Sequence, residues 1–463
     1  MRALGTLIIA ALACAGTAAN ASVASDFFPI CAKPPASAAR TLTVDPSGRG
    51  AYPNIPAALK AAKPGDFVDL MTGDYGDVRI DGRNSGFVTI EAAPGQTPQF
   101  TKLLIGEGGG ASHWRLKGLS VSGFSTGMWG NGIAHPGLVF MTNSDNIIFE
   151  ENNIYSQNGQ MSWKSEADMA AAKMTVSGGI GVDQSSCISI VKNHLSNLFN
   201  GIMVGGDQTG DRGKYFVVDG NTIDNIAGDG IDHSASHIRI LHNQITNSHD
   251  ICENKCIHTD GIQGWNWHNK PGLLNTDVVI DSNEIILQTK PGLVLTAGDF
   301  HGITIFDGIW DGMQISNNLI VTGTWHGIST NRVNNLSIVN NTVVGTNPAR
   351  GTWIAYNPNK NDPPDTVYHI VIRNNVAPAI ANDKRGATQA GLAVDHNLVL
   401  KSASDFADNF VKFDPEHFAY DLHPTKRSDA RGEGSAEGAP AVDIDGRPRQ
   451  GKIDVGAYAY QGN

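Results

Sequence analysis

The sequence has few cysteines, few charged residues and, after its first residues, no long apolar run. Of its 463 residues, 5 are cysteine and 17% are charged, and acidic residues outnumber basic ones by 45 to 34. The net charge of −11 disfavours nucleic-acid binding, which needs a clustered basic face, and predicts no attraction to a membrane. No later run is apolar enough to predict a spanning helix. Hydrophobic residues are abundant, at 40%, which is ample for one long core.

The N-terminal segment is the one apolar stretch. Met1 and Arg2 form a charged start, and the run from Leu4 to Cys14 is apolar. Ala19-Asn20-Ala21 then supplies the small residues typical of a cleavage site. This pattern predicts a secretory signal peptide over residues 1–21, followed by a linker over residues 22–40. We therefore expect a secreted or periplasmic protein.

Four cysteines remain after the predicted signal peptide. In an oxidising compartment, the close pair Cys252 and Cys256 is expected to form a disulfide that staples the loop between them. The spacing leaves the pairing of Cys31 and Cys187 open.

A short phrase recurs along the middle of the chain: alternating aliphatic residues, an Asn, and another aliphatic residue. The closest copies are roughly 22 residues apart, a period that predicts a stacked solenoid. The alternation indicates strands, and an Asn at each bend is expected to bond the next coil through its side-chain amide. The repeated asparagines are Asn152, Asn193, Asn221, Asn243, Asn283, Asn318, Asn341, Asn375 and Asn397.

The segment before these repeats has the composition of a cap. Thr41–Val44 is expected to be a strand, and residues 57–62 a short amphipathic helix that Pro64 and Gly65 end. A helix over the open end of a solenoid covers strand edges that would otherwise pair with other chains. We expect one domain over residues 41–463, with a cap and first coils at 41–80 and a closing segment at 400–463.

Two segments resemble the pectate-lyase-like right-handed parallel β-helix superfamily. The first runs from Ile55 through Pro64-Gly65-Asp66 to Gly73-Asp74-Tyr75, and the second includes Pro440–Asp443 and Asp454–Tyr458. The resemblance implies an all-β fold: a right-handed parallel β-helix of about ten coils with an N-terminal capping helix and an Asn ladder. It also implies three parallel sheets per coil, with the substrate groove on the first.

The Gly-Ile phrase that recurs between the asparagines is expected to form this first sheet. Coils stack about 4.8 Å apart, so equivalent residues form columns. Three columns hold many polar side chains, which predicts the groove at this face. They are Asn200, Asp229, Asp260, His301 and His326; Met203, Asp232, Gln263, Thr304 and Ser329; and Gly205, Ser234, Trp265, Phe306 and Asn331.

The predicted catalytic residues surround the segment from Lys255 to His268. His258 is the candidate base or acid, because imidazole titrates near neutral pH. Lys255 and Arg332 are the cations expected to neutralise a uronate carboxylate. The complete predicted catalytic set is His258, Asp260, Asp232, His233, Lys255 and Arg332.

Aromatic and amide side chains near these residues predict sugar binding, because sugars have flat apolar faces edged with hydroxyl groups. Clustered carboxylates repel one another unless they are protonated, hydrogen-bonded or metal-bound, so Asp229 and Asp232 are predicted to hold Ca²⁺. The predicted substrate-binding residues are Gln263, Trp265, Trp267, His268, His301, His326 and Asn331.

The favoured function is a polysaccharide lyase that cleaves an acidic polysaccharide by β-elimination and acts as a monomer. A C5-epimerase would use the same proton abstraction. A glycoside hydrolase is the second hypothesis: His258-Thr259-Asp260-Gly261 is similar to the Asn-Thr-Asp-Gly motif of polygalacturonases, and His326–Ser329 to their Gly-His-Gly-Ile-Ser motif. That similarity implies Asp260 as a catalytic carboxylate, and Asp232 is its candidate partner. The third hypothesis is a polysaccharide-binding solenoid without catalysis.

Overall fold

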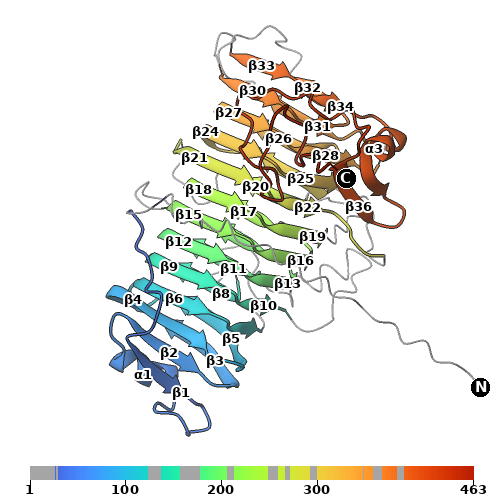
Figure 1. Cartoon of the computed structure of the whole chain (residues 1–463). Helices are drawn as coiled ribbons and strands as arrows, with labels where there is room; N and C mark the ends of the chain where they lie inside the picture. The colour runs from blue at the N-terminus through green and yellow to red at the C-terminus, as the bar shows by residue number, and fades with distance from the viewer. Residues whose placement is uncertain are drawn as a thin grey trace, which may run out of the picture.

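The computed structural model describes residues 27, 30–123, 137–156, 178–205, 213–248, 259–265, 272–291, 300–347, 349–357, 368–382 and 391–462. The chain winds through stacked coils whose strands run parallel, from β1 at one end to β33 at the other (Figure 1). This is the predicted right-handed parallel β-helix. In the described part of the chain, no helix has the length and apolar character that a membrane span requires.

The second sheet consists of the alternating strands that precede each Asn. In β12, Ile188 and Ile190 face the core while their neighbours are partly exposed. The sheet has 13 strands: β1 (Arg40–Val44), β2 (Asp66–Leu70), β4 (Gly82–Ala92), β6 (Ala111–Lys117), β9 (Ser144–Glu150), β12 (Ser186–Val191), β15 (Lys214–Asp219), β18 (Ser236–Leu241), β21 (Leu274–Asp281), β24 (Ile309–Ser316), β27 (Val333–Val339), β30 (Ile370–Arg373) and β33 (Leu392–Asp395).

The first sheet consists of the Gly-Ile strands, as predicted. After β3 (Gly73–Ile80) and β5 (Pro98–Ile105), which begin this side of the solenoid, its strands pair coil by coil. They are β8 (Val139–Thr142), β11 (Ile180–Asp183), β14 (Ile202–Val204), β17 (Ile231–His233), β20 (Thr259–Gly264), β23 (Phe300–Ile305), β26 (His326–Asn331), β29 (Trp353–Asn357) and β32 (Ile380–Asn382).

The third sheet consists of the short strands that follow each Asn. The long strand β5 pairs with strands of both the first and the third sheet, which joins these two sheets at one end. The strands of the third sheet are β7 (Ser120–Ser122), β10 (Asn153–Tyr155), β13 (His194–Leu198), β16 (Thr222–Ile226), β19 (Gln244–Ser248), β22 (Glu284–Ile286), β25 (Leu319–Thr322), β28 (Thr342–Gly345), β31 (Val376–Ala377) and β34 (Leu398–Val399).

The predicted asparagine ladder lies at the corner between the second and third sheets. Asn243 accepts bonds at Oδ1 from the backbone and side-chain amides of Asn221, at 3.0 and 2.9 Å. Its own Nδ2 donates to Asn283 Oδ1 and to the carbonyl of Val218, each at 2.9 Å. The same pattern links Asn152 to Asn397 from coil to coil. Each amide is therefore satisfied by the coils on both sides.

The second sheet has 13 strands, whereas about ten coils were predicted. The prediction was too low because the first coils lack the asparagine from which the coils were counted. Helix α1 (Ile55–Ala61) lies beside β1 at this end of the molecule (Figure 1). Asn54 accepts a bond from Ala57 N as its N-cap. Ile55 and Ala58 join the apolar core.

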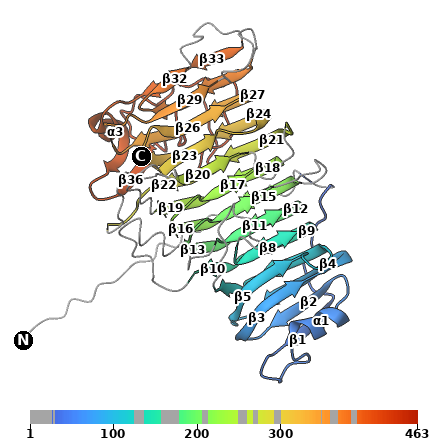
Figure 2. The same cartoon turned by 180° about the vertical axis from the view of Figure 1, so that it is seen from behind.

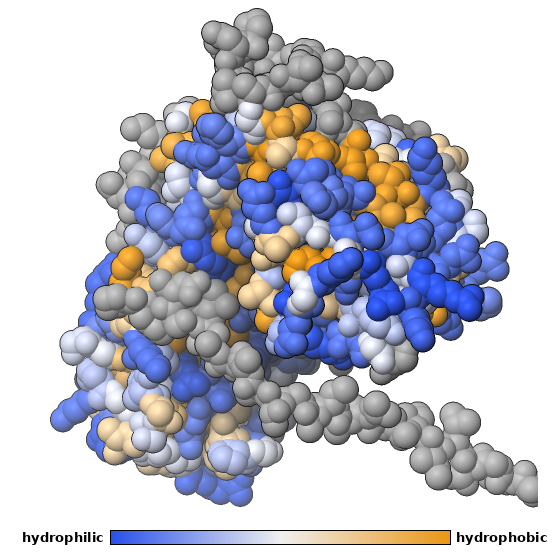
Figure 3. Space-filling model, turned by 45° about the horizontal axis from the view of Figure 1, so that its top comes forward, coloured by the Kyte–Doolittle hydropathy of each residue, from blue (hydrophilic) through white to orange (hydrophobic). Residues whose placement is uncertain are grey.

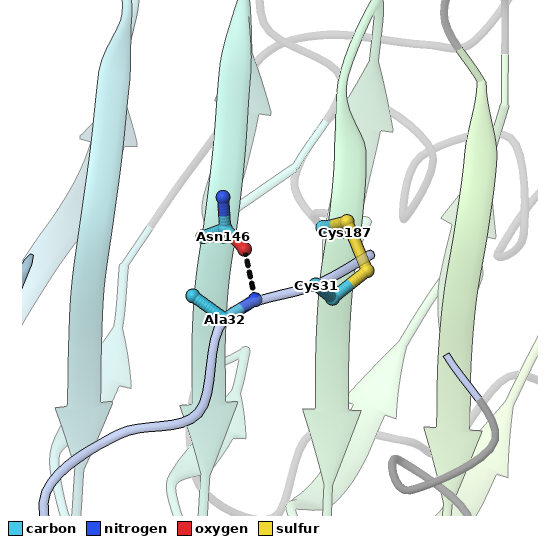
Figure 4. The surroundings of a disulfide bond; sticks show 4 residues. All are labelled: Cys31, Ala32, Asn146 and Cys187. Carbon is cyan, nitrogen blue, oxygen red and sulfur yellow. Dashed lines mark hydrogen bonds between the residues drawn. A yellow bond between two sulfur atoms is a disulfide. The ribbon is translucent and has the colours of Figure 1, made fainter. Parts of the chain in front are cut away.

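An N-terminal strap, residues 30–34 together with Phe27, crosses the outside of the second sheet. Cys31 forms a disulfide with Cys187 on β12, and Ala32 N donates to Asn146 Oδ1 on the neighbouring strand β9 (Figure 4). The Phe27 ring lies edge-on to Tyr215, with a centroid distance of 5.5 Å. The structure thus pairs the two cysteines that the sequence left open, whereas Cys252 and Cys256 lie outside the described residues.

The closing segment folds back over the outer face of the third sheet. It contains α3 (Ala403–Asn409) and the antiparallel hairpin of β35 (Phe410–Asp414) and β36 (Ala419–Pro424). Phe406, Phe410 and Leu422 pack on outward-facing residues such as Val321 and Val344, which forms a second apolar cluster. With the top of the molecule turned forward, the visible surface is largely hydrophilic, with apolar patches that are most extensive towards the top and upper right of the view (Figure 3).

We predict that Asn243→Ala lowers the free energy of unfolding by about 3–5 kcal/mol, because it leaves several buried backbone and side-chain groups of the neighbouring coils without partners. Chemical denaturation measures this change. Gln244→Ala is the matched control, because the neighbouring Gln244 side chain is exposed and bonds only at the surface to Glu284. Equal stability of the two variants would contradict the ladder's contribution.

Candidate active site

The polar columns predicted for the first sheet are present in the structure. The strands that carry them lie one above another when the molecule is viewed from behind (Figure 2). Asp260 pairs with His301 in one column. The column that follows Gly-Ile runs in register through Met203, Asp232, Gln263, Thr304 and Ser329.

Glycine in the repeated phrase allows this strand to lie close to the third sheet. A Cβ on Gly261 would lie 2.4 Å from Ile285 Cγ2 and 2.9 Å from the carbonyl oxygen of Gly302. Only glycine avoids this collision with the core and the next coil. Ile262 joins the apolar core, whereas Asp260 and Gln263 bond to each other outside it.

Asp260 lies at the centre of the polar contacts. Its Oδ1 accepts bonds from His301 Nδ1 at 3.0 Å and from Thr304 Oγ1 at 2.7 Å. Its Oδ2 accepts a bond from Gln263 Nε2 at 3.0 Å. These donors occupy both oxygens of a carboxylate that is 0% exposed. An ionised carboxylate is an acceptor only, so three donors suit that form and fix its orientation.

Two further aspartates stand one coil below. Asp229 Oδ1 accepts a bond from the backbone N–H of Asp260 at 2.7 Å. Asp232 is 3% exposed, and its Oδ1 has no hydrogen-bond partner among the described residues. Burial raises the pKa of Asp232 well above its usual value, and the nearby charges of Asp229 and Asp260 raise it further. The cluster therefore contains two different carboxyl groups: Asp232, whose surroundings favour the protonated form, and Asp260, which accepts hydrogen bonds from three donors.

His233 does not belong to this outer cluster. Its ring lies edge-on to the buried Trp310, at a centroid distance of 5.2 Å, and both ring nitrogens lack hydrogen-bond partners in the described part of the chain. A Cβ on Gly264, in the next coil, would come within 3.1 Å of His233 Nε2. The side chain thus occupies the core space that this glycine leaves, and burial lowers its pKa from 6.5 to about 3. We leave His233 out of the candidate site.

The other described residues of the predicted site divide between two places. His301 and His326 lie close together at one end of the strands, with ring centroids 4.7 Å apart. Gln263 is half-buried on β20, and Trp265, half-buried just after β20, lies in the register column of Asn331. Asn331 and Arg332 lie at the far end of β26 from His326. There Asn331 accepts a bond from Asn357, and the backbone N–H of Arg332 donates to the Asn357 carbonyl.

Several predicted residues lie outside the described residues, so their roles stay predictions: His258, Lys255, Trp267, His268, Cys252 and Cys256, as well as the signal peptide over 1–21. Two aromatic residues that join the described site, Trp325 and Trp353, were missed. Their signal in the sequence was their place immediately before His326-Gly327 and before Ile354.

The calcium prediction gains no support from the described residues, which contain no group of three or more His, Cys, Asp or Glu arranged to hold a metal. Calcium takes six to eight oxygen ligands. Asp229 and Asp232 alone do not supply them, and a protonated Asp232 is a poor ligand.

No protein-family model and no curated protein sequence matches the chain. Among solved structures, it is similar to pectate lyase Pel9A, with a TM-score of 0.48, 14% identity and coverage of 92% of this chain and 97% of that one. It is also similar to XylC in complex with xylose, with a TM-score of 0.49, 12% identity and coverage of 91% of this chain and 99% of that one. A GH87 alpha-1,3-glucanase from Streptomyces thermodiastaticus is similar with a TM-score of 0.43, 13% identity and coverage of 79% of this chain and 69% of that one. The fold is a right-handed parallel β-helix, and it rests on the strand register described above.

We predict that Asp232→Asn stabilises the protein and that the gain grows as the pH rises. A carboxyl whose pKa is raised by folding adds its full stability below its ordinary pKa of 3.8. As the pH rises from the unfolded pKa through the folded pKa, this contribution to the free energy of unfolding is lost. The loss is about 1.4 kcal/mol for each pH unit between the two pKa values. Melting temperatures at about pH 5 and pH 8 test this. Asp77→Asn, at an exposed position, should show no such trend, and a parallel trend in both variants would contradict the burial of charge at Asp232.

For His233 the sign is opposite. The folded pKa of about 3 lies below the ordinary value of 6.5, so the stability is present above pH 6.5 and is lost as the pH falls toward 3. Between neutral pH and about pH 4, the wild type should lose about 3 kcal/mol that His233→Leu does not lose. Urea denaturation at the two pH values measures the difference. Equal losses in both proteins would show that His233 is not a buried neutral imidazole.

Proposed function

We propose that the chain is a carbohydrate-active enzyme that hydrolyses glycosidic bonds of a polysaccharide at the outer face of the first sheet. The observation that carries this proposal is the proximity of two buried carboxyl groups, Asp232 and Asp260, on adjacent coils in different environments. Burial and neighbouring charges favour the proton on Asp232, whereas three donors hold Asp260. Glycoside hydrolysis uses two carboxyl groups separated in this way.

The roles follow from these environments. Asp232 donates its proton to the leaving glycosidic oxygen, and Asp260 acts on the opposite side of the bond, either as the base that activates water or as the nucleophile. His301 and Thr304 position the Asp260 carboxylate through their bonds to Oδ1. The anomeric configuration of the first product distinguishes the two roles of Asp260.

The lyase favoured by the sequence is the alternative. β-Elimination needs a base and a cation beside a uronate carboxylate. The candidates Lys255 and His258 lie outside the described residues, and Arg332 lies at the far end of β26. The charges of Asp229 and Asp260 on adjacent coils would also repel a carboxylate on the substrate. The described residues therefore suit hydrolysis better than elimination, and epimerisation shares the requirements of elimination.

Secretion is part of the proposal. The Cys31–Cys187 disulfide suits an oxidising compartment, which agrees with the predicted signal peptide over residues 1–21. We expect the mature protein outside the cytoplasm, where polysaccharides are its substrates.

The test is incubation of the purified protein with neutral and acidic polysaccharides, with both reducing ends and the ultraviolet absorbance of unsaturated products recorded. We expect new reducing ends without that absorbance. Unsaturated products would establish the lyase instead, and binding without a change in polymer size would favour the non-catalytic solenoid.

We predict that Asp260→Asn lowers the hydrolytic rate by roughly 10²–10⁴-fold, the range typical of a lost acid or base. Asp232→Asn should cause a comparable loss while it raises stability. Initial rates on the best substrate measure both effects, with Asp77→Asn as the control. Full activity in Asp260→Asn would place the reaction elsewhere.

A further inference from the structure

An aromatic cluster continues the first sheet beyond the aspartates, on the C-terminal side. It consists of His301, Phe306, Trp325, His326 and Trp353. The His326 ring is in edge-on contact with all four others, at centroid distances of 4.7 Å to His301, 5.0 Å to Phe306, 5.7 Å to Trp325 and 5.4 Å to Trp353. His301 also donates to Asp260, so the cluster adjoins the proposed catalytic carboxylate directly.

These rings are not part of the apolar core. Phe306, Trp325 and Trp353 are partly exposed, whereas the core residue Trp310 is 1% exposed. Large aromatic side chains gathered on an outer strand face, next to buried acids, are not needed to hold the coils together. They form instead an apolar surface edged by polar groups, which is the character of a carbohydrate-binding surface.

Hydrogen bonds fix the orientation of the cluster. Trp353 Nε1 donates to Ser329 Oγ at 3.1 Å, and Ser329 Oγ lies 2.8 Å from His326 Nδ1. The Ser329 hydroxyl therefore joins the Trp353 indole to the His326 imidazole through two hydrogen bonds. Both rings are thereby held in place before a ligand arrives, which reduces the entropy lost on binding.

The two tryptophans are not equivalent. The guanidinium of Arg350 lies over the Trp325 ring, 5.3 Å from its centroid, so that ring is already engaged in a cation–π contact. Alternate residues of a strand face the same side, so Trp353, Ala355 and the exposed Asn357 lie on one side of β29. Asn357 in turn donates to Asn331 on β26. β29 and the neighbouring strand β26 thus present one indole and two side-chain amides.

We propose that Trp353 is the stacking platform for a pyranose ring of the polysaccharide, on the C-terminal side of the bond that is cleaved, with Asn357 and Asn331, at the other end of β29 and β26, as partners for the hydroxyl groups of a neighbouring sugar. The inference deepens the proposed function and rests on it for the position of the cleaved bond. It assigns a neutral sugar to this position, because the contacts are an apolar ring face and uncharged amides. The polysaccharide chain then runs along the solenoid axis, from the aspartates toward β29.

The experiment uses the Asp260→Asn protein, so that binding is measured without turnover. It is titrated with hexasaccharides of β-1,4-linked glucose, β-1,4-linked xylose and α-1,4-linked galacturonate, and intrinsic tryptophan fluorescence and calorimetry give Kd. We expect a neutral hexasaccharide to bind, with Kd raised about 10-fold or more by Trp353→Ala. Trp353→Phe, which keeps an aromatic face, should largely restore affinity. Tyr215→Ala, a half-buried aromatic on the second sheet, is the control and should bind like the parent.

Asn357→Ala, at an exposed position, is the second variant in case Trp353→Ala fails to fold, and it should raise Kd about 3-fold or more. Unchanged Kd in both variants, or the absence of binding by every hexasaccharide, overturns the platform. If binding depends on Trp353 but the wild type cleaves none of the sugars, the platform stands and the hydrolase proposal fails. If the wild type cleaves a sugar whose KM is unaffected by Trp353→Ala, the hydrolase stands and the platform fails.

Discussion

The structure depends on the parallel pairing of each coil with the coils above and below it. At one corner of the coils, buried asparagines add side-chain hydrogen bonds to this backbone pairing. Each side-chain amide bonds to the preceding coil and to the following coil. A shift of one coil by one residue would break the ladder and turn core residues outward. The same constraint places Asp229 against Asp260 and Asp232 against Gln263, so the candidate site is a product of the register.

This constraint also explains how much of the fold could be predicted. The asparagine spacing and the Gly-Ile phrase are direct consequences of stacking, and both sheets that they predict are present. The columns through Asp232, Gln263 and Thr304 follow from the same register. His233 shows the limit of such reasoning. Adjacent strand residues face opposite sides, so its neighbour Asp232 joins the polar face while His233 enters the core beside the space left by Gly264.

Trp353 was missed for a different physical reason. Its strand pairs with β26 through an irregularity between His326 and Ile328, so that His326 faces Trp353 while Ile328 faces Ile354. The glycine that marks the repeated phrase is absent from this coil, and the column cannot be extended by counting from Gly-Ile. The acidic residues, His301, His326 and Phe306 were therefore accessible from the sequence, whereas the assignment of Trp325 and Trp353 to the site required coordinates.

The N-terminal strap has a practical consequence for how the protein is produced. Its disulfide joins residues 156 positions apart. In the chain-entropy model, closing so long a loop lowers the entropy of the unfolded chain and thereby stabilises the folded protein by about 5 kcal/mol. The strap also lies over Ile148, Val191 and Val217, which line the pocket beneath it. Synthesis in a reducing cytosol would leave this apolar strip uncovered and promote aggregation, so recombinant protein should be directed to the periplasm.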